Sequence, residues 1–394
     1  MIKTPQASRL LSLDVLRGIT IAGMILVNNP GDWGHVYAPL RHAEWDGLTP
    51  TDLVFPFFMF IMGVSMYLSY KKFDFKFSKQ TFTKLLRRSV LLFLIGLALS
   101  SFGLLCGGTG DLWGEDTGLL QKMVQAGRRF EHLRILGVLE RLALVSFFGS
   151  LIVLLVRQKF IPFLIAVILA AYWILIAATN SFLPTENNIV AVIDKLILGS
   201  SHMYKLSVDG VSVTFDPEGL LSTLPCLAHV LIGFWAGKLI AEGTSNEERS
   251  RKLFVFGTLM LFAGYFLSYG FPINKSLWSS SFVLVTCGLA SLLLGLLIWI
   301  IDMRGRRKWS VYFESFGVNP MFIYVIAAVL AVSIDVIGFS YQNGWISIKS
   351  FFGSVCLQTV FGDYFGSLLF AVLFNVTCWS VGHILYRKKI FIKL

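Results

Sequence analysis

Apolar and polar positions alternate along this chain in long blocks. Apolar runs of about 20 residues, enough for a helix to cross a hydrocarbon core of about 30 Å, recur over almost the whole length. They lie around residues 18–27, 53–70, 89–105, 136–156, 160–178, 219–240, 253–270, 280–301, 316–336 and 365–386. The pattern predicts an all-α, polytopic membrane helix bundle with about ten transmembrane helices.

Two further segments differ from this pattern. Residues 346–361 are apolar but short and interrupted, so we expect a re-entrant or interfacial helix; an eleventh crossing there would move the C-terminus to the other face. Segment 179–217 contains the amphipathic N-N-I-V-A-V-I-D-K-L-I-L-G, followed by V-D-G-V-S-V-T-F, which alternates like a strand. We expect this segment to lie on the membrane surface, where it could cover a site from outside.

Composition supports a single membrane domain over residues 1–394. Hydrophobic residues make up 55% of the chain and charged residues 14%, against about 25% charged in a soluble domain. No cleavage pattern precedes the first span, which we expect to stay in the mature protein. The five cysteines form no C-x-x-C pair and the six histidines no H-E-x-x-H motif, so neither a disulfide framework nor a metal site is predicted.

The net charge of +11 is unevenly distributed. Basic clusters lie at residues 71–88, 304–308 and 387–393. The alternate segments, which are poorer in Lys and Arg relative to acids, lie at 30–52, 106–133, 179–217 and 271–279. By the positive-inside rule the clusters face the cytoplasm, and with ten spans both termini are cytoplasmic. For most of these lysines, contact with anionic lipid headgroups is sufficient to explain the charge.

The stretch H-A-E-W-D-G-L-T-P-T-D-L-V-F-P-F-F-M-F-I-M-G (42–63) places polar groups directly before an apolar span. Taken alone, His42 is typical of an interfacial hydrogen-bonding residue. Carboxylates attract an ammonium and aromatic rings stack on sugars, so this outer mouth could bind an amino sugar; Trp33 is assigned to an interfacial aromatic belt instead. The candidates are Trp45, Asp46, Asp52 and Glu218, with Lys275 and Trp278 on the same predicted side.

Charged residues also lie at or within span ends, where an unpaired charge in hydrocarbon costs several kcal/mol. They are Asp14 and Arg17 in S-L-D-V-L-R-G, Glu140 and Arg141 in R-I-L-G-V-L-E-R, and Glu218 in D-P-E-G-L-L. Either these residues pair with one another and fix helix packing, or they have a functional role. Both interpretations imply a polar interior.

Several motifs, in order along the chain, resemble the heparan-α-glucosaminide N-acetyltransferase family and its bacterial amino-sugar acetyltransferase relatives. The motifs are R-L-L-S-L-D-V-L-R-G (9–18), V-N (27–28), the stretch 41–63, R-I-L-G-V-L-E-R (134–141), D-P-E-G-L-L-S-T (216–223), P-I-N-K-S-L-W-S-S-S-F-V (272–283), G-V-N-P-M-F-I-Y-V (317–325) and R-K-K-I-F-I-K-L (387–394). S-L-D-x-L-R-G alone also occurs in other membrane acyltransferases. The combination is specific and spans almost the full chain.

The resemblance implies a bundle, often a homodimer, that takes acetyl-CoA from the cytoplasm and acetylates the amine of a glucosamine on the far side. It makes His42 the catalytic histidine and Asn28 its polar neighbour. The basic positions expected to hold the nucleotide and phosphates of CoA are Arg9, Arg17, Arg88 and Lys393. The residues expected to support the site are Asp14, Arg134, Arg141 and Asn319. A bacterial inner-membrane location follows from the bacterial relatives, with no nucleic-acid partner.

The chain departs from the family pattern in three ways. Asp46 stands where Asn is frequent, the loop between Asn28 and His42 is longer than in the animal enzymes, and no counterpart of their large lumenal domain precedes the first span. These differences leave the acceptor open. O-acetylation of a cell-envelope glycan, with the same donor and histidine, is an alternative. So is a small-solute transporter, although no inverted repeat supports it.

The chemistry required is modest because a thioester is already activated. Neutral His42 could accept the amine proton, a role worth about 10²–10⁴-fold, or carry the acetyl group as acetyl-imidazole. The Asn28 amide could donate to the tetrahedral oxygen, where losing one donor costs about 10²–10³-fold. The narrow pantetheine arm of CoA could thread between helices while its phosphates pair with arginines on the inner face.

Overall fold

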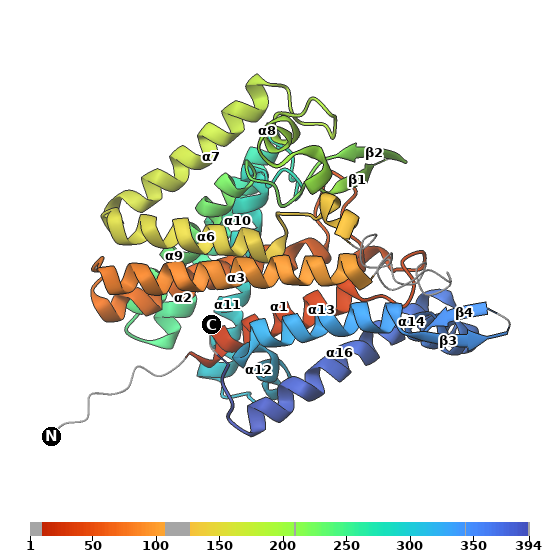
Figure 1. Cartoon of the computed structure of the whole chain (residues 1–394). Helices are drawn as coiled ribbons and strands as arrows, with labels where there is room; N and C mark the ends of the chain where they lie inside the picture. Colours follow the sequence, from red (N-terminus) through yellow and green to blue (C-terminus); the bar gives the residue numbers. More distant parts are fainter. Residues whose placement is uncertain (1–9, 107–126, 209, 343, 393–394) are drawn as a thin grey trace.

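The computed structural model describes residues 10–106, 127–208, 210–342 and 344–392, and these form a helical bundle (Figure 1). Within these ranges nine helices are long and apolar enough to cross a membrane. They are α1 (Leu11–Asn28), α2 (Val54–Tyr70), α3 (Lys79–Cys106), α6 (Val138–Leu155), α7 (Ile161–Ala178), α9 (Thr223–Glu242), α10 (Asn246–Ser268), α11 (Ser280–Leu297) and α16 (Asp363–Arg387). The predicted polytopic helix bundle is therefore confirmed, and the protein is an integral membrane protein.

Burial divides these helices into central and peripheral ones. In the most apolar window of α9, 67% of the residues are buried, and in that of α11, 61%. The corresponding share is only 17% in α3 and 22% in α10, whose remaining apolar surface faces outward. Exposed apolar surface on this scale suits lipid rather than water. The central helices α9 and α11 therefore form the inside of the bundle.

The predicted span at 316–336 differs from expectation because it is bent. Two helices replace it, α12 (Ser310–Val318) and α13 (Pro320–Val336), and their axes meet at 88°. Pro320 lacks a backbone N–H and disfavours helical geometry in the residue before it, so α12 ends at Val318 and Asn319 is not helical. Gly18 and Gly317 let α1 and α12 cross closely, since a Cβ on either would overlap the backbone of the other helix.

Shorter elements connect the helices. The 3₁₀ segments are η1 (Ala38–Leu40), η2 (Pro50–Leu53), η3 (Lys71–Phe73), η4 (Phe130–His132), η5 (Gln158–Phe160) and η6 (Ser200–His202). The π-helical segments are η7 (Ile298–Met303) and η8 (Phe351–Gln358). Together with α14 (Ile348–Ser350) and α15 (Thr359–Phe361), η8 forms a short apolar helix, as predicted for 346–361. That segment's first residues belong instead to a strand.

Two antiparallel hairpins and a surface helix cover one end of the bundle. The hairpins are β1 (Lys205–Val208) with β2 (Val211–Thr214) and β3 (Gly338–Tyr341) with β4 (Gly344–Ser347). The predicted amphipathic helix is α8 (Ile189–Leu198). Its buried Asp194 accepts hydrogen bonds from the backbone N–H groups of Leu220 (2.9 Å) and Leu221 (3.0 Å). The carboxylate therefore fastens α8 to the segment that enters α9.

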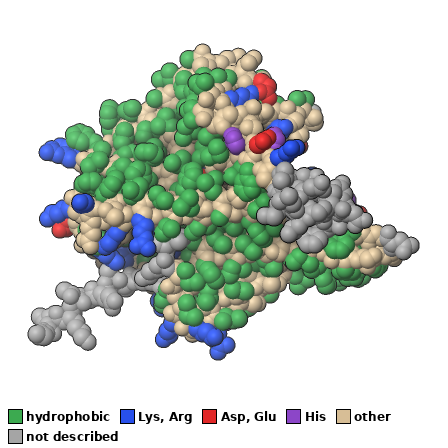
Figure 2. Space-filling view, in the orientation of Figure 1, with side chains coloured by type: hydrophobic (Ala, Val, Ile, Leu, Met, Phe, Trp, Pro, Cys, Tyr) green, Lys and Arg blue, Asp and Glu red, His purple; other side chains and the backbone are tan. Residues whose placement is uncertain are grey.

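We call the end that carries the loop 29–53, α8 and both hairpins the cap end, and the opposite end, where α1 begins and α16 ends, the basal end (Figure 1). In Figure 2 many Lys and Arg side chains gather toward the basal end, on the left and below. A broad hydrophobic surface separates them from a smaller group of charged residues at the cap end. This separation fits a transmembrane bundle, while the orientation of the two ends in a cell stays a prediction.

Candidate active site

His42 lies in the loop that joins α1 to α2, and Asp52 holds its imidazole. The Nδ1 atom of His42 lies 2.6 Å from Oδ1 of Asp52. Because a carboxylate only accepts, Nδ1 carries the hydrogen of this bond, and in a neutral imidazole Nε2 is then the acceptor. The side chain of His42 is 48% exposed, whereas that of Asp52 is 1% exposed. The ring is therefore fixed from the buried side and accessible from the cap end.

The turn around Asp52 satisfies its second carboxylate oxygen. Oδ2 accepts hydrogen bonds from the backbone N–H groups of Ala43 (3.1 Å) and Thr49 (3.1 Å) and from the Thr49 hydroxyl (2.9 Å). Thr49 and Asp52 form a capping box at the start of η2, and Pro50 occupies the first position of that segment. The local sequence T-P-T-D thus builds a buried, fully hydrogen-bonded carboxylate directly beneath His42.

Lys275 approaches the same ring from the loop between α10 and α11. Its Nζ lies 3.0 Å from Nδ1 and 3.3 Å from Nε2 of His42, and 3.5 Å from Oδ1 of Asp52. Burial lowers the pKa of the Lys275 ammonium, although the charges of Asp52 and Glu218 oppose that shift. A cation, an imidazole and a carboxylate therefore meet at one point of the cap end.

The loop that carries Lys275 is docked on the loop that carries His42. The Asn274 amide donates to Oδ1 of Asp46 (3.0 Å), and the backbone N–H of Gly47 donates to the carbonyl of Ile273 (2.7 Å). The side-chain oxygen of Asn274 also accepts from the N–H of Leu277 (2.7 Å), which closes the turn. Asn274 therefore joins two loops that are more than 200 residues apart in the sequence.

A second network lies at the entrance to α6 and α9. Arg134 donates to both carboxylate oxygens of Asp216 (3.0 and 2.5 Å) and to Oε2 of Glu218 (2.5 Å). Burial opposes the charge of Arg134, but Asp216 and Glu218 raise its pKa above the ordinary value. Burial likewise raises the pKa of Glu218, but Arg134 and Arg141 hold it below the ordinary value. These shifts favour the charged forms of Arg134 and Glu218.

Comparison with known proteins decides what kind of enzyme carries this site. A profile of the acyltransferase domain matches residues 10–379, nearly the whole chain. The chain belongs to this acyltransferase family. It is 27% identical over 375 residues to human (Homo sapiens) heparan-alpha-glucosaminide N-acetyltransferase, covering 80% of this chain and 52% of the human protein. The mouse (Mus musculus) protein of the same name is 27% identical over 372 residues, covering 81% and 53%.

These comparisons confirm the family relationship that the motifs predicted, at the level of distant relatives. The chain spans about half the length of the curated relatives that it matches. The protein is therefore a membrane acyltransferase, and its finer activity is a matter for proposal.

The acyltransferase's predicted donor-binding residues lie toward the basal end or outside the described residues. Arg17 donates to Asp14 (3.0 Å), to Ser65 (3.0 Å) and to the carbonyl of Gly317 (3.4 Å). Arg88 is exposed on α3. Arg9 and Lys393 lie outside the described residues. The contact of all four with CoA stays a prediction.

Asn319 holds the chain close to its C-terminal end. Its amide donates to the carbonyl of Ile390 (2.8 Å), and its oxygen accepts from the N–H of Ile392 (2.8 Å). The bend between α12 and α13 thus frees an asparagine to bind the segment after α16. A role of Asn319 in supporting the active site stays a prediction.

Other predicted site residues are placed less directly. Asn28 is the exposed last residue of α1, and among the described residues no recorded hydrogen bond joins it to His42, so its oxyanion role stays a prediction. Trp45 is buried in an apolar cluster of the cap, where its indole N–H donates to the carbonyl of Phe182 (2.8 Å) and its ring meets Phe215 edge-on at 5.3 Å. This packing gives Trp45 a structural role. Sugar contacts by Trp45, Asp46, Asp52, Glu218 and Lys275 stay predictions.

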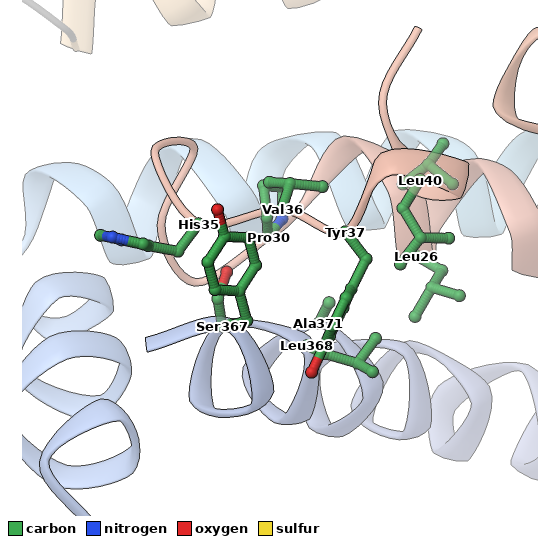
Figure 3. A pocket seen from close by; sticks show the side chains of 11 residues that line it. Leu26, Pro30, His35, Val36, Tyr37, Leu40, Ser367, Leu368 and Ala371 are labelled. Carbon is green, nitrogen blue, oxygen red and sulfur yellow. The ribbon is translucent and has the colours of Figure 1, made fainter. Parts of the chain in front are cut away.

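A second histidine–aspartate pair lies in the same loop. His35 Nδ1 is 2.6 Å from Oδ2 of Asp32, and its Nε2 is 3.8 Å from a carboxylate oxygen of Asp363. Figure 3 shows the loop and α16 enclosing a small pocket, with the His35 ring pointing away from Leu26 and Leu40. Hydrogen bonds from His35 and from the backbone N–H of Gly34 lower the pKa of Asp32.

The contribution of Asn274 was not foreseen, and Trp278 was expected only on the same side as Lys275. The sequence P-I-N-K-S-L-W-S-S-S carries a local signal for the first, because Asn stabilises turns and Ser279 caps α11 by accepting from the N–H of Phe282 (3.3 Å). No local signal indicates that this turn meets His42. That contact depends on the packing of α11 against α2.

Proposed function

We propose that this acyltransferase moves acetyl from acetyl-CoA to the amine of a glucosamine-type sugar, with His42 as general base. The observation that carries the proposal is the exposed imidazole held by a buried carboxylate and accompanied by an ammonium. The name of the human and mouse relatives supports a glucosamine-type acceptor, because it specifies N-acetylation of a glucosaminide. The same name supports an acetyl donor.

One base, His42, is sufficient for the proton transfers of this reaction. The neutral amine attacks the thioester carbonyl carbon, forming the C–N bond, while Nε2 of His42 takes the amine proton. Asp52 stabilises the imidazolium through Nδ1–H. The tetrahedral intermediate then collapses, the C–S bond breaks, and the sulfur leaves with the electron pair. The imidazolium proton passes to sulfur, so that the products are the N-acetyl sugar and the CoA thiol.

Lys275 supplies a positive charge beside this proton transfer. Its Nζ lies within 3.3 Å of both ring nitrogens of His42. A cation at this distance attracts the negative charge that develops on the carbonyl oxygen and on sulfur. Asp52 offsets the repulsion between Lys275 and the imidazolium. Lys275 therefore contributes to the site without acting as the base.

The donor is proposed to arrive from the basal end. Arginines bind phosphates through several hydrogen bonds, and Arg17 and Arg88 lie on helices that run to that end. The pantetheine arm would then extend through the bundle to His42 at the cap end. We propose that the basal end with both termini faces the cytoplasm of a bacterial inner membrane, and that the protein is a homodimer.

A panel of acceptors tests the proposal. Purified protein is incubated with acetyl-CoA and, in separate reactions, glucosamine, N-acetylglucosamine or glucose, and the products are weighed by mass spectrometry. We expect glucosamine alone to gain one acetyl group, as an amide stable to mild alkali. Acetyl esters on N-acetylglucosamine would support O-acetylation instead. Absence of transfer to every amine would contradict the proposal.

The same reactions distinguish direct transfer from an acetyl-histidine intermediate. Acid quenching followed by mass spectrometry of the protein should show no acetyl group on the His42 peptide if His42 acts as a base. A labelled His42 peptide before acceptor is added would show that Nε2 carries the acetyl group instead.

A further inference from the structure

Trp278 lies one turn away from Lys275 and is buried beneath the His42 site. It is 1% exposed, and its φ of 53° places a bulky residue in the left-handed region. Such a conformation is strained for a side chain of this size and persists only where surrounding contacts enforce it. Here the turn is closed by the N–H of Trp278 to the carbonyl of Lys275 (3.0 Å) and by the Asn274 bonds. The turn therefore aims the indole into the bundle.

Arg141 lies against that indole. Its Cζ is 5.4 Å from the Trp278 ring centroid, and the residue is fully buried. One nitrogen, Nη2, donates to the carbonyl of Gly219 (2.9 Å) and to the hydroxyl of Ser222. Among the described residues, Nε and Nη1 of Arg141 have no hydrogen-bond partner, and neither has Nε1 of Trp278. Three buried nitrogens of this contacting pair thus lack a recorded hydrogen bond, while the Cys226 thiol also interacts with Arg141.

His229 of α9 completes this cluster from the other side. Its ring centroid lies 5.8 Å from that of Trp278, the residue is fully buried, and neither ring nitrogen has a described partner. Phe55 meets Trp278 edge-on at 5.4 Å. Phe55 follows Asp52 by one turn, as Trp278 follows Lys275. The cluster of Arg141, Trp278 and His229 is therefore connected to the His42 site through the short segments 52–55 and 275–278.

The interior beside Phe55, which contacts Trp278, contains a small apolar pocket. A pocket lined by Ile21, Met24, Phe58, Leu142 and Tyr324 borders Phe55. It lies between α1, α2, α6 and α13, and its lining is almost wholly apolar. A donor arm that comes from the basal end would have to pass this region before its acyl group could reach His42.

Buried N–H groups without an acceptor are costly, and those of a guanidinium more so. They require an acceptor that the described residues do not supply. The nearby charges of Glu218 and Asp194 act on Arg141 and its surroundings. A neutral acceptor whose oxygen gains negative charge during a reaction therefore fits this position better than a full anion.

We propose that Arg141 and Trp278 form the receptor for the carbonyl oxygen of an acyl thioester. The assignment rests on the proposed function. When the amine attacks, the carbonyl π electrons move to oxygen, where the Arg141 and Trp278 N–H groups stabilise the charge; on collapse the C=O bond re-forms and the thiolate leaves. His42, at the cap end, accepts the amine proton. Asn28, the donor expected from the sequence, would act from the exposed side.

Ligand binding tests this receptor separately from turnover. The variants are Trp278→Phe, which keeps the ring and removes the N–H, and Arg141→Lys, which keeps the charge and a donor for Gly219. Affinities for acetyl-CoA and for CoA, which lacks the carbonyl, are measured without acceptor sugar. Each variant should lose about tenfold in acetyl-CoA affinity and keep CoA affinity within about twofold. The kcat for glucosamine should fall by about 10²-fold.

Trp379→Phe is the matched control. Trp379 lies on α16, stacked on Tyr312 and His383 at 5.5 and 4.6 Å, and its indole N–H also has no described partner. Removing this N–H should change neither the affinity for acetyl-CoA nor the kcat for glucosamine. CoA binding and the melting temperature report whether each variant is folded, and Trp278→Phe decides the question if Arg141→Lys does not fold.

The outcomes separate the two proposals. If wild-type protein binds acetyl-CoA and transfers acetyl, but Trp278→Phe keeps the same preference for acetyl-CoA over CoA, the receptor assignment is wrong and water fills that position. If wild-type protein does not bind acetyl-CoA at all, the proposed function fails and this assignment fails with it. Loss of CoA and acetyl-CoA affinity in equal measure by a folded Trp278→Phe also overturns the receptor.

Discussion

The loop between α1 and α2 contains two histidine–aspartate pairs with the same 2.6 Å contact between Nδ1 and a carboxylate oxygen. Their carboxylates differ in burial, because the side chain of Asp52 is 1% exposed and that of Asp32 is 35% exposed. Asp52 also accepts three further hydrogen bonds from Ala43 and Thr49. A lysine meets His42, whereas a second carboxylate lies near His35.

The difference shows that the surroundings, more than the residue types, determine what such a pair does. A buried carboxylate with every oxygen satisfied fixes the imidazole in one orientation and strengthens the electrostatic contact. An exposed pair is screened by solvent and contributes little. Asp32 is instead tied to α16, where its N–H and carbonyl bond to the Ser367 hydroxyl (3.0 Å each). We interpret the His35–Asp32 pair as a structural contact that holds the loop against α16.

Replacing each histidine by glutamine should give the largest contrast. His42→Gln removes the base and should lower kcat for glucosamine acetylation by about 10²–10⁴-fold, with acetyl-CoA affinity retained. His35→Gln should leave kcat within about twofold. Initial rates by mass spectrometry and equilibrium binding of acetyl-CoA measure both. Similar losses in the two variants would remove the distinction between the pairs.

Neutralising the carboxylates should give the next effect. Asp52→Asn places an amide where four hydrogen bonds converge on carboxylate oxygens, so the His42 ring loses its fixed orientation. We expect kcat to fall by about 10²-fold or more and KM for glucosamine to change little. Asp32→Asn is the control and should preserve kcat. A catalytically normal Asp52→Asn would show that the carboxylate only supports the loop.

Removing Lys275 tests the group that the His35 pair lacks. Lys275→Met keeps the length of the buried stem but removes the charge, and we expect about a tenfold loss in kcat/KM. Lys195→Met, on α8 at the same cap end, removes a lysine paired with Glu186 and should have no effect on turnover. Steady-state kinetics at matched protein amounts compare the two. Unchanged kinetics in Lys275→Met would leave the lysine as a loop contact.

Burial of another carboxylate should give the smallest effect, on stability rather than activity. Burial raises the pKa of Asp194 from 3.8 to about 6. Because the folded pKa lies above the unfolded one, this group's stabilisation is complete below the unfolded pKa and is lost as pH rises through the folded one. Asp194→Asn should therefore have a higher melting temperature than wild type at neutral pH, and its free energy of unfolding should be larger by at most about 3 kcal/mol. At acid pH the two proteins should have the same melting temperature.

Asp335→Asn is the exposed counterpart, since that side chain is 61% exposed near Lys349. Its melting temperature should follow wild type at both pH values. Detergent-solubilised melting curves at acid and neutral pH measure these differences. A lower melting temperature of Asp194→Asn at neutral pH would mean that the ionised carboxylate stabilises the fold.

The sequence predicted the spans well because hydrocarbon imposes one simple requirement, a long apolar run with every backbone group paired. The bend at Asn319 was not predicted from the sequence, because Pro320 is only one residue in a stretch that is apolar on both sides. The amphipathic helix α8 and strand β2 followed from local periodicity. In these elements local pattern and final structure depend on the same residues.

The site could be predicted only in part. The motif located His42, but Asp52 was expected at the sugar, because ten residues and a 3₁₀ turn separate it from the histidine that it holds. Lys275 reaches His42 across 233 positions of sequence. Trp278 and Arg141 meet only because α6 and α11 both pack against α9 inside the bundle. Such long-range contacts have no periodic signal in a single sequence.

The most direct test of the account is a structure of the protein with glucosamine and an unreactive acetyl-CoA analogue bound together. We predict that the amine nitrogen lies about 3 Å from Nε2 of His42, with the acyl carbonyl carbon in contact with that nitrogen and the CoA phosphates at the basal end. An acyl group out of reach of His42, or a sugar bound at His35, would contradict the assignment of the active site.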